Sequence, residues 1–292
     1  MHHLGEIAIR DTWFGAFAKS TRRPGGISNL TVGVCDDCFV VTVFAYEFPH
    51  RKTRDGLVNL VASGIDVEMV IGAPRRVLNL RKPILNYSAK SSALPTTLDI
   101  CREFGLTYVA GDHNSPEIQN LVDYTRPKVG LILGARILSQ KTIEKFSVGI
   151  LNLHPGMLPD NAGLYNIEWA INQGIPQGVS AHLVNAEIDS GQLLERQVIQ
   201  SLETLRRLVD LRLTLSDIEM SMTPKLIRGL ISSEDLPRHS LSGQTRYHPE
   251  ISRVAEVSAG AKFALYRKRY DVIYATYLSK QPKELASFTV SI

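Results

Sequence analysis

The chain has 292 residues, of which 44% are hydrophobic, which is enough for one substantial core or for one domain with an appendage. Its formal net charge of +4 is compatible with anionic substrates but is too small to predict a nucleic-acid-binding protein. No apolar run approaches the length of a membrane span, and residues 1–6 lack the pattern of a secretory signal, so we expect a cytoplasmic protein.

The cysteines do not predict a metal site. Cys35 and Cys38 form a single CxxC pair with two aspartates between the sulfurs, and Cys101 is the third cysteine. A zinc site requires a second pair of ligands, and the aspartates oppose formation of a thiolate. We therefore interpret all three as incidental thiols.

The first half of the sequence predicts an α/β fold. Residues 1–30 combine aromatic side chains with a Pro-Gly-Gly turn, which indicates an N-terminal extension. Beyond them, β-branched and aromatic runs alternate with segments of helical spacing. The predicted strands are 39–45, 67–72, 106–110 and 129–134, and the predicted helices are 52–63, 96–104 and 115–124. This alternation predicts a doubly wound, mostly parallel sheet with right-handed crossovers.

The second half continues the pattern and then changes. Asn166 is placed to cap a short helix over 167–172, and strands 178–184 and 192–200 are expected to pair. A helix over 202–222 carries an apolar stripe that should cover the sheet. From residue 232 the composition differs, and 263–277 is either a helix or a pair of strands. We expect an N-terminal extension (1–30), a catalytic domain (31–231) and a small C-terminal extension docked on it (232–292).

The most informative stretch is the apolar run 148–154. Asn152 and His154 are two residues apart, so they project from the same face of a strand. Pro155 and Pro159 end the strand there, at the carboxyl edge where open α/β sheets bind ligands. Either residue alone could be structural: a buried histidine with satisfied hydrogen bonds, or an asparagine that bonds to a turn. Together they could hold a carbonyl oxygen that gains negative charge during acyl transfer.

A nearby carboxylate would complete this group. Asp189 precedes Ser190-Gly191, so it could be only a turn residue. Near an imidazole, it would favour the charged ring and could take a proton from an attacking amine, directly or through water. We expect His182, on the preceding strand, to support the loop of Asp189.

The sequence resembles the folate-dependent formyltransferases over roughly residues 31–230. The shared signature contains Asn152, His154-Pro155, Leu158-Pro159, Gly163, Gly178-Val179-Ser180, His182, Val184, Asp189 and Gly191. The resemblance implies a Rossmann-like formyltransferase fold, Asn152, His154 and Asp189 as the catalytic triad, and 10-formyltetrahydrofolate as the formyl donor. It also implies that two loops bind the folate, with residues Arg136, Ile137, Leu138, Asn185, Ala186, Glu187 and Ile188.

The acceptor is less constrained. The turn 45–50 contains no glycine, unlike the phosphate-binding turn of the glycinamide ribonucleotide enzymes, and the loop 160–165 lacks the Arg-Gly-Ala-type run of the methionyl-tRNA enzymes. Trp169-Ala170-Ile171 with Gly174 is similar to the amino-sugar N-formyltransferases. We expect a small amine, with a nucleotide-linked amino sugar as first choice. Methionyl-tRNA, hydrolysis of the donor and an inactive folate-binding protein are the alternatives, and a homodimer is compatible with each.

Overall fold

The computed structural model describes residues 41–76, 83–85, 94–232 and 236–292, so the predicted extension 1–30, Cys35 and Cys38 lie outside the described residues. The strands are β1 (Val41–Tyr46), β2 (Val67–Ala73), β3 (Tyr108–Ala110), β4 (Val129–Ile132), β5 (Gly149–His154), β6 (Ala162–Gly163), β7 (Gly178–Leu183), β8 (Gln192–Val198), β9 (His239–Ser240), β10 (Tyr247–His248) and β11 (Thr289–Ser291). The helices are α1 (Arg51–Ala62), α2 (Thr97–Phe104), α3 (Pro116–Thr125), α4 (Gln140–Ile143), α5 (Asn166–Gln173), α6 (Leu208–Ile231), α7 (Arg253–Lys268), α8 (Tyr270–Lys280) and α9 (Lys283–Ala286).

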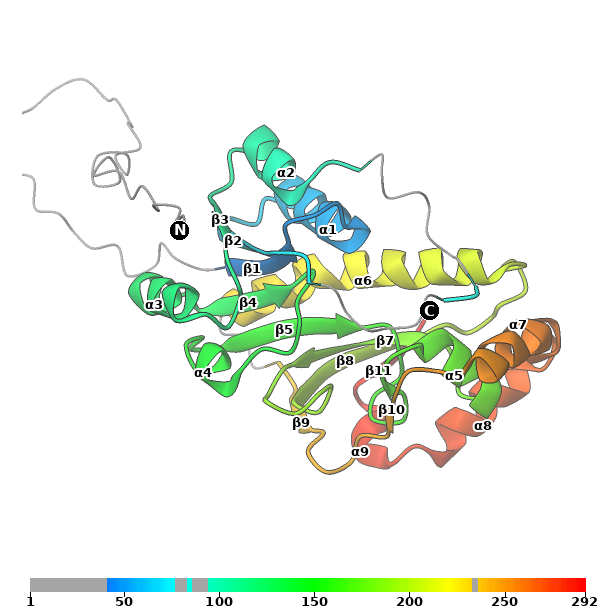
Figure 1. Ribbon diagram of the computed structural model, residues 1–292. Helices are drawn as coiled ribbons and strands as arrows, with labels where there is room; N and C mark the ends of the chain where they lie inside the picture. Colours follow the sequence, from blue (N-terminus) through cyan, green and yellow to red (C-terminus); the bar gives the residue numbers. More distant parts are fainter. Residues whose placement is uncertain (1–40, 77–82, 86–93, 233–235) are drawn as a thin grey trace, which may run out of the picture. The chain divides into compact units, whose positions relative to one another are not determined.

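One sheet runs through the described part of the chain, in the order β11-β8-β7-β5-β4-β1-β2-β3. The strands from β3 to β5 are all parallel, whereas β7 runs antiparallel to β5, and β8 runs antiparallel to β7. The strands β9 and β11 both pair with β8, and β6 and β10 form a separate small sheet. β11 is parallel to β8, so the sheet has a parallel half and a mixed half that meet at β5 (Figure 1).

Helices cover both faces of the parallel half. Val43 of β1 packs in a core with residues of α1 and α6, whereas its neighbour Phe44 packs with residues of α3 and α4. This alternation follows from the two-residue period of a strand. Ribbons of α1, α2 and α6 lie on one side of the sheet, and α3 and α4 lie on the other (Figure 1). The predicted doubly wound, mostly parallel α/β fold is confirmed.

Two local predictions about helices were wrong. The helix predicted over 202–222 begins only at Leu208, because Leu202 reaches the core from a turn before it. It then continues through Pro224 to Ile231. Proline lacks the N–H that would bond the carbonyl of Met220, and the side-chain amide of Asn59 donates to that carbonyl instead, at 2.7 Å. Asn166 is not the cap of α5 but its first residue, with Tyr165 at the N-cap position.

The C-terminal residues pack against the main sheet. The segment 263–277 is helical and is divided between α7 and α8. The buried Tyr270 donates its hydroxyl hydrogen to the carbonyl of Ile199, at 3.0 Å, and α7 packs against α5. The strand β11 adds to the edge of β8, so the predicted C-terminal extension contributes a strand to the sheet. Within the described ranges, no helix has the length and apolar character needed to cross a membrane.

Candidate active site

Asn152 and His154 lie on β5, at the junction of the two halves of the sheet. Ile150 lies on the same face of β5 and packs in the core formed with residues of α3 and α4. This face of the strand therefore changes from apolar to polar toward its carboxyl end. On the antiparallel partner β7, His182 is opposite Asn152, and Ser180 is opposite His154. The chain leaves the strand directly after His154, as predicted from the prolines.

Asp189 approaches this strand end from the loop between β7 and β8. Its backbone has φ of +51°, a left-handed conformation that aspartate tolerates better than most residues. The N–H of Gly163 donates to Asp189 Oδ2 at 2.8 Å. A Cβ on Gly191 would lie 1.8 Å from the carbonyl oxygen of Leu183, so only glycine permits the close return of this loop. The loop thus holds the carboxylate in a defined position.

His154 and Asp189 form a buried ion pair. His154 Nδ1 lies 3.4 Å from Asp189 Oδ2, and Nε2 donates to the carbonyl oxygen of Asn161 at 2.8 Å. Asn166 Nδ2 also lies 2.9 Å from Nε2, but it donates to the same carbonyl of Asn161 at 3.1 Å. Asp189 and this carbonyl can only accept hydrogen bonds, so a doubly protonated, charged ring satisfies both. Burial by itself would lower the pKa of His154, but the Asp189 carboxylate outweighs it and raises the pKa. Burial likewise opposes ionisation of Asp189, but the charge and hydrogen bond of His154 hold its pKa well below the usual range.

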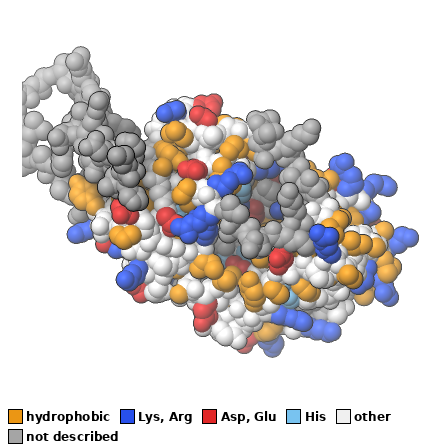
Figure 2. Space-filling model, in the orientation of Figure 1, with side chains coloured by type: hydrophobic (Ala, Val, Ile, Leu, Met, Phe, Trp, Pro, Cys, Tyr) orange, Lys and Arg blue, Asp and Glu red, His pale blue; other side chains and the backbone are white. Residues whose placement is uncertain are grey.

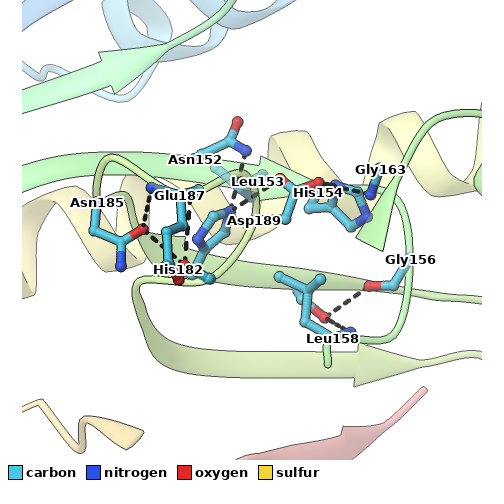
Figure 3. A network of polar contacts seen from close by, with 12 residues as sticks. Asn152, Leu153, His154, Gly156, Leu158, Gly163, His182, Asn185, Glu187 and Asp189 are labelled. Atoms are coloured by element: carbon cyan, nitrogen blue, oxygen red, sulfur yellow. Dashed lines mark hydrogen bonds and ion pairs between the residues drawn. The ribbon is translucent and has the colours of Figure 1, made fainter. Parts of the chain in front are cut away.

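His182 faces the same carboxylate and stays neutral. Its Nε2 lies 3.8 Å from Asp189 Oδ1 and 3.1 Å from the side-chain nitrogen of Asn152. Burial lowers the pKa of His182 to about 4, and the positive charge of His154 adds to this effect. Figure 3 shows Asn152, His182, Asp189 and His154 converging from β5, β7 and the β7–β8 loop.

A pocket of about 210 Å³ opens beside this group. Two loops form its walls, and all seven residues predicted to bind the folate line it: Arg136, Ile137, Leu138, Asn185, Ala186, Glu187 and Ile188. Asn152 and Asp189 line it as well. Its wall also includes the apolar side chains Ile132, Ile143 and Val184, so the pocket combines an apolar surface with polar groups at the strand end.

Hydrogen bonds within the protein hold the two loops that form the pocket wall. The guanidinium of Arg136 donates to the carbonyl of Pro74 at 2.7 Å, and the hydroxyl of Tyr46 donates to the carbonyl of Ala135 at 2.9 Å. In the second loop, the Ser190 hydroxyl donates to Asn185 Oδ1 at 2.8 Å. One nitrogen of the Arg136 guanidinium is therefore bonded to the protein, which fixes the side chain beside the pocket.

The structure brings the three predicted catalytic residues together at the end of β5. Asn152 and Asp189 line the pocket. His154 lies directly behind Asp189, and its two ring nitrogens face the Asp189 carboxylate and the carbonyl of Asn161. The contact of His154 with a substrate carbonyl stays a prediction. Asn161 and Asn166 contact His154, but the sequence pointed to neither as a site residue and gave Asn166 only a capping role. Their position shortly after the histidine was the available signal.

A family comparison agrees with this geometry. The model of the family described as "Formyl transferase" matches residues 57–225, which include β5 and the loop of Asp189. The protein belongs to the formyl transferase family. A methionyl-tRNA formyltransferase of Enterococcus faecalis is 22% identical over 204 residues, which cover 68% of this chain and 62% of the relative. A phosphoribosylglycinamide formyltransferase of Haemophilus influenzae is 32% identical over 110 residues, which cover 36% of this chain and 49% of the relative.

This member of the family thus aligns with about half to three-fifths of the length of these two relatives. Among solved structures, it is similar to a sugar N-formyltransferase from a Shewanella species, with a TM-score of 0.54 and 14% identity, over 77% of this chain and 87% of that one. At this identity the likeness shows a shared fold. That fold places the ends of β5 and the β7–β8 loop together.

Proposed function

We propose that this protein transfers a formyl group from 10-formyltetrahydrofolate to a primary amine of a small metabolite, with nucleotide-linked amino sugars as the first acceptor class to test. The observation that carries the proposal is the single pocket that Asn152 and Asp189 share with the two predicted folate-binding loops. Membership of the family supports the formyl transfer. The absence of an Arg-Gly-Ala-type run in the loop 160–165 supports a small acceptor over tRNA.

The residues of the pocket fit a folate. Its apolar side chains suit a flat ring, and the backbone groups of 136–138 and 185–188 suit the polar edge of that ring. When bound there, 10-formyltetrahydrofolate would supply the formyl group as an activated carbonyl. Every other part of the chemistry is assigned to side chains of the protein.

Asn152 is the proposed donor to the carbonyl oxygen that gains negative charge. His182 Nε2 lies 3.1 Å from Asn152 Nδ2. For the NH₂ group to point into the pocket, the amide must be flipped, so that its oxygen faces His182 Nε2. The neutral tautomer of His182 that carries hydrogen on Nε2 allows this, and Asp189 Oδ1 at 3.8 Å favours the same tautomer. Nδ1 of His182 has no hydrogen-bond partner among the described residues. In this tautomer Nδ1 carries no hydrogen, so no buried N–H is left unpaired. His182 is in this view a positioning residue for Asn152.

Asp189 is the proposed partner of the attacking amine. Its carboxylate accepts a hydrogen bond from the amine and stabilises the positive charge that develops on nitrogen. Because its pKa is held below the usual range, it is a weak base, and the proton leaves through water. His154 balances the charge of Asp189 and fixes its position, so it acts through the carboxylate.

The test is to incubate the protein with 10-formyltetrahydrofolate and a panel of amines, and to follow the folate absorbance and the acceptor mass. The panel contains nucleotide-linked amino sugars and methionyl-tRNA, and one sample has no amine. Formylation of an amino sugar supports the proposal. Formylation of methionyl-tRNA alone, release of formate without an amine, or donor binding without turnover would replace it with another function.

The variant that tests the site directly is Asn152→Ala. We expect it to lower the turnover number by about 10² to 10³, because one donor to the developing oxyanion is lost. Donor binding, measured by titration, should persist because the loops that form the pocket are unchanged. Asn172→Ala is the matched control, since its amide bonds the carbonyl of Ala255 outside the pocket. Unchanged turnover in Asn152→Ala would remove this residue from the mechanism.

A further inference from the structure

A second cavity, of about 710 Å³, lies in the C-terminal half of the chain and shares no lining residue with the first pocket. One face of α8 forms a wall, together with the loop after α5 and the turn that follows His154. The segment that leads into β10 forms the opposite wall. The proposed formyl transfer does not use this cavity.

Three cationic side chains line the cavity: Arg246, Arg269 and Lys280. None of them forms an ion pair with a carboxylate in the ranges that the structure describes. Other exposed cations of this protein do so, as Arg207 does with Asp210 and Lys225 does with Glu195. Figure 2 shows Lys and Arg side chains gathered on the part of the surface where Figure 1 places α7 and α8. The cavity thus concentrates positive charge that the described residues leave unpaired.

Among the described residues, one acidic residue lines the cavity, and a buried arginine balances its charge. Asp160 accepts a hydrogen bond from the hydroxyl of Tyr277 at 2.7 Å. Behind Tyr277 lies Arg196, which is 0% exposed and contacts that hydroxyl at 3.4 Å and Gln281 Oε1 at 3.0 Å. Among the described residues, the Arg196 guanidinium bonds to carbonyl, hydroxyl and amide oxygens and to no carboxylate, and its charge interacts with that of Asp160, which bonds to the same Tyr277 hydroxyl. The three surface cations therefore remain unbalanced.

The same cavity has an apolar wall. Val272 and Ile273 of α8 line the cavity, and so do Ile175 and Pro159. Val272 is 69% exposed, which is unusual for a β-branched apolar side chain that borders a concave surface. A ligand that fits both features has an anionic group with several acceptor oxygens and an apolar or aromatic portion.

We propose that this cavity binds an organic phosphate, with the phosphoryl group held by Arg246, Arg269 and Lys280 and the apolar portion packed against α8. Guanidinium groups present several N–H donors in a plane, which matches the oxygens of a phosphoryl group. The site goes beyond formyl transfer and does not depend on it, because its test measures binding to a different part of the chain.

The experiment is a calorimetric titration of the full chain at low ionic strength with phenyl phosphate and, separately, with inorganic phosphate. We expect saturable binding of phenyl phosphate to one site, with weaker binding of inorganic phosphate because it lacks the apolar portion. Arg246→Ala and Arg269→Ala should each weaken the binding by about tenfold, the usual effect of losing one charged hydrogen bond. Val272→Ser should weaken the binding of phenyl phosphate and leave the binding of inorganic phosphate unchanged.

Arg253→Ala is the matched control, because it removes an exposed positive charge from α7 outside the cavity. It should bind phenyl phosphate as the unaltered chain does. All substituted side chains are exposed, so the unfolding midpoint should stay constant and confirm that each variant is folded. Absence of saturable binding, equal binding by an Arg246→Ala/Arg269→Ala double variant, or binding of a single-stranded oligonucleotide without phenyl phosphate would overturn the proposal.

Discussion

His154 and His182 lie on neighbouring strands and face one carboxylate, but their pKa values move in opposite directions. His154 has Asp189 at 3.4 Å on one nitrogen and the carbonyl of Asn161 on the other, and its pKa is raised. His182 is 3.8 Å from the same carboxylate, and its second nitrogen has no hydrogen-bond partner among the described residues; its pKa falls to about 4.

The difference shows that acceptors on both ring nitrogens decide which histidine carries the charge. Two buried imidazolium groups beside one carboxylate would repel each other, so charging His154 keeps His182 neutral. The site is thereby divided into a charged side, toward the loop 161–166, and a neutral side next to Asn152. Three substitutions test this division, from the largest expected effect to the smallest.

The largest effect is expected for Asp189→Asn, which removes the carboxylate that distinguishes the two histidines. Asparagine tolerates φ of +51° and keeps an oxygen for the N–H of Gly163. We expect turnover to fall by about 10³, because the charge opposite the attacking amine is lost. In an NMR titration the pKa of His154 should fall from its raised value, because burial and the charge of Lys52 lower it and only the hydrogen bond to Asn161 still raises it.

Glu187→Gln is a suitable control for Asp189→Asn, because it neutralises another carboxylate of the same loop. It should retain the raised pKa of His154. If Asp189→Asn left that pKa raised, the ion pair would not be its cause.

An intermediate effect is expected for His154→Gln, which removes the positively charged imidazole beside Asp189. Turnover should fall by about 10², because Asp189 loses its counter-ion and its fixed position. A histidine with a raised folded pKa stabilises the fold fully below its unfolded pKa of about 6.5, and this contribution is lost as the pH rises through the folded pKa. Each pKa unit corresponds to about 1.4 kcal/mol.

The measurement for His154→Gln is the free energy of unfolding of both proteins between pH 5.5 and about 9, the range around the ordinary histidine pKa. The difference between them should be largest at the acidic end and should shrink as the pH rises. A difference that grew toward alkaline pH would contradict a charged His154.

The smallest effect is expected for His182→Gln on the neutral side. Glutamine can still contact the amide of Asn152, so turnover should fall by only about tenfold through poorer orientation of that amide. Because the pKa of His182 is about 4, the group is neutral throughout the neutral range, and the pH profile of turnover should not shift. A change in KM for the donor with unchanged kcat would assign His182 to binding in place of positioning.

The parallel half of the sheet was predictable from local signals. The strands β1, β2 and β4 are buried along most of their length and read as continuous apolar runs, and the prolines after His154 marked the end of β5. The position of Asn152 at a pocket and the two loops beside it followed from the spaced signature. The strands and their ends depend on residues that are close together in the sequence, whereas the two loops were predicted from the family resemblance.

The rest depends on contacts between distant residues. The Asn59 amide that allows α6 to pass Pro224 is 161 residues from the carbonyl it bonds, and no local pattern reports it. The orientation of the His154 ring depends on the carbonyl of Asn161, a backbone group whose direction is set by the fold. The addition of β11 to the edge of β8 likewise joins segments about 90 residues apart.

The loop from Val184 to Asp189 both lines the pocket and ends in the carboxylate that sets the proton affinity of His154. A molecule that settles against this loop and shifts Asp189 therefore changes how tightly His154 holds its proton. By thermodynamic reciprocity, the protonation of His154 changes the affinity of the loop for that molecule by the same factor. Occupancy of the pocket should thus be accompanied by net uptake or release of hydrogen ions, measurable as a dependence of the binding enthalpy on the ionisation heat of the buffer.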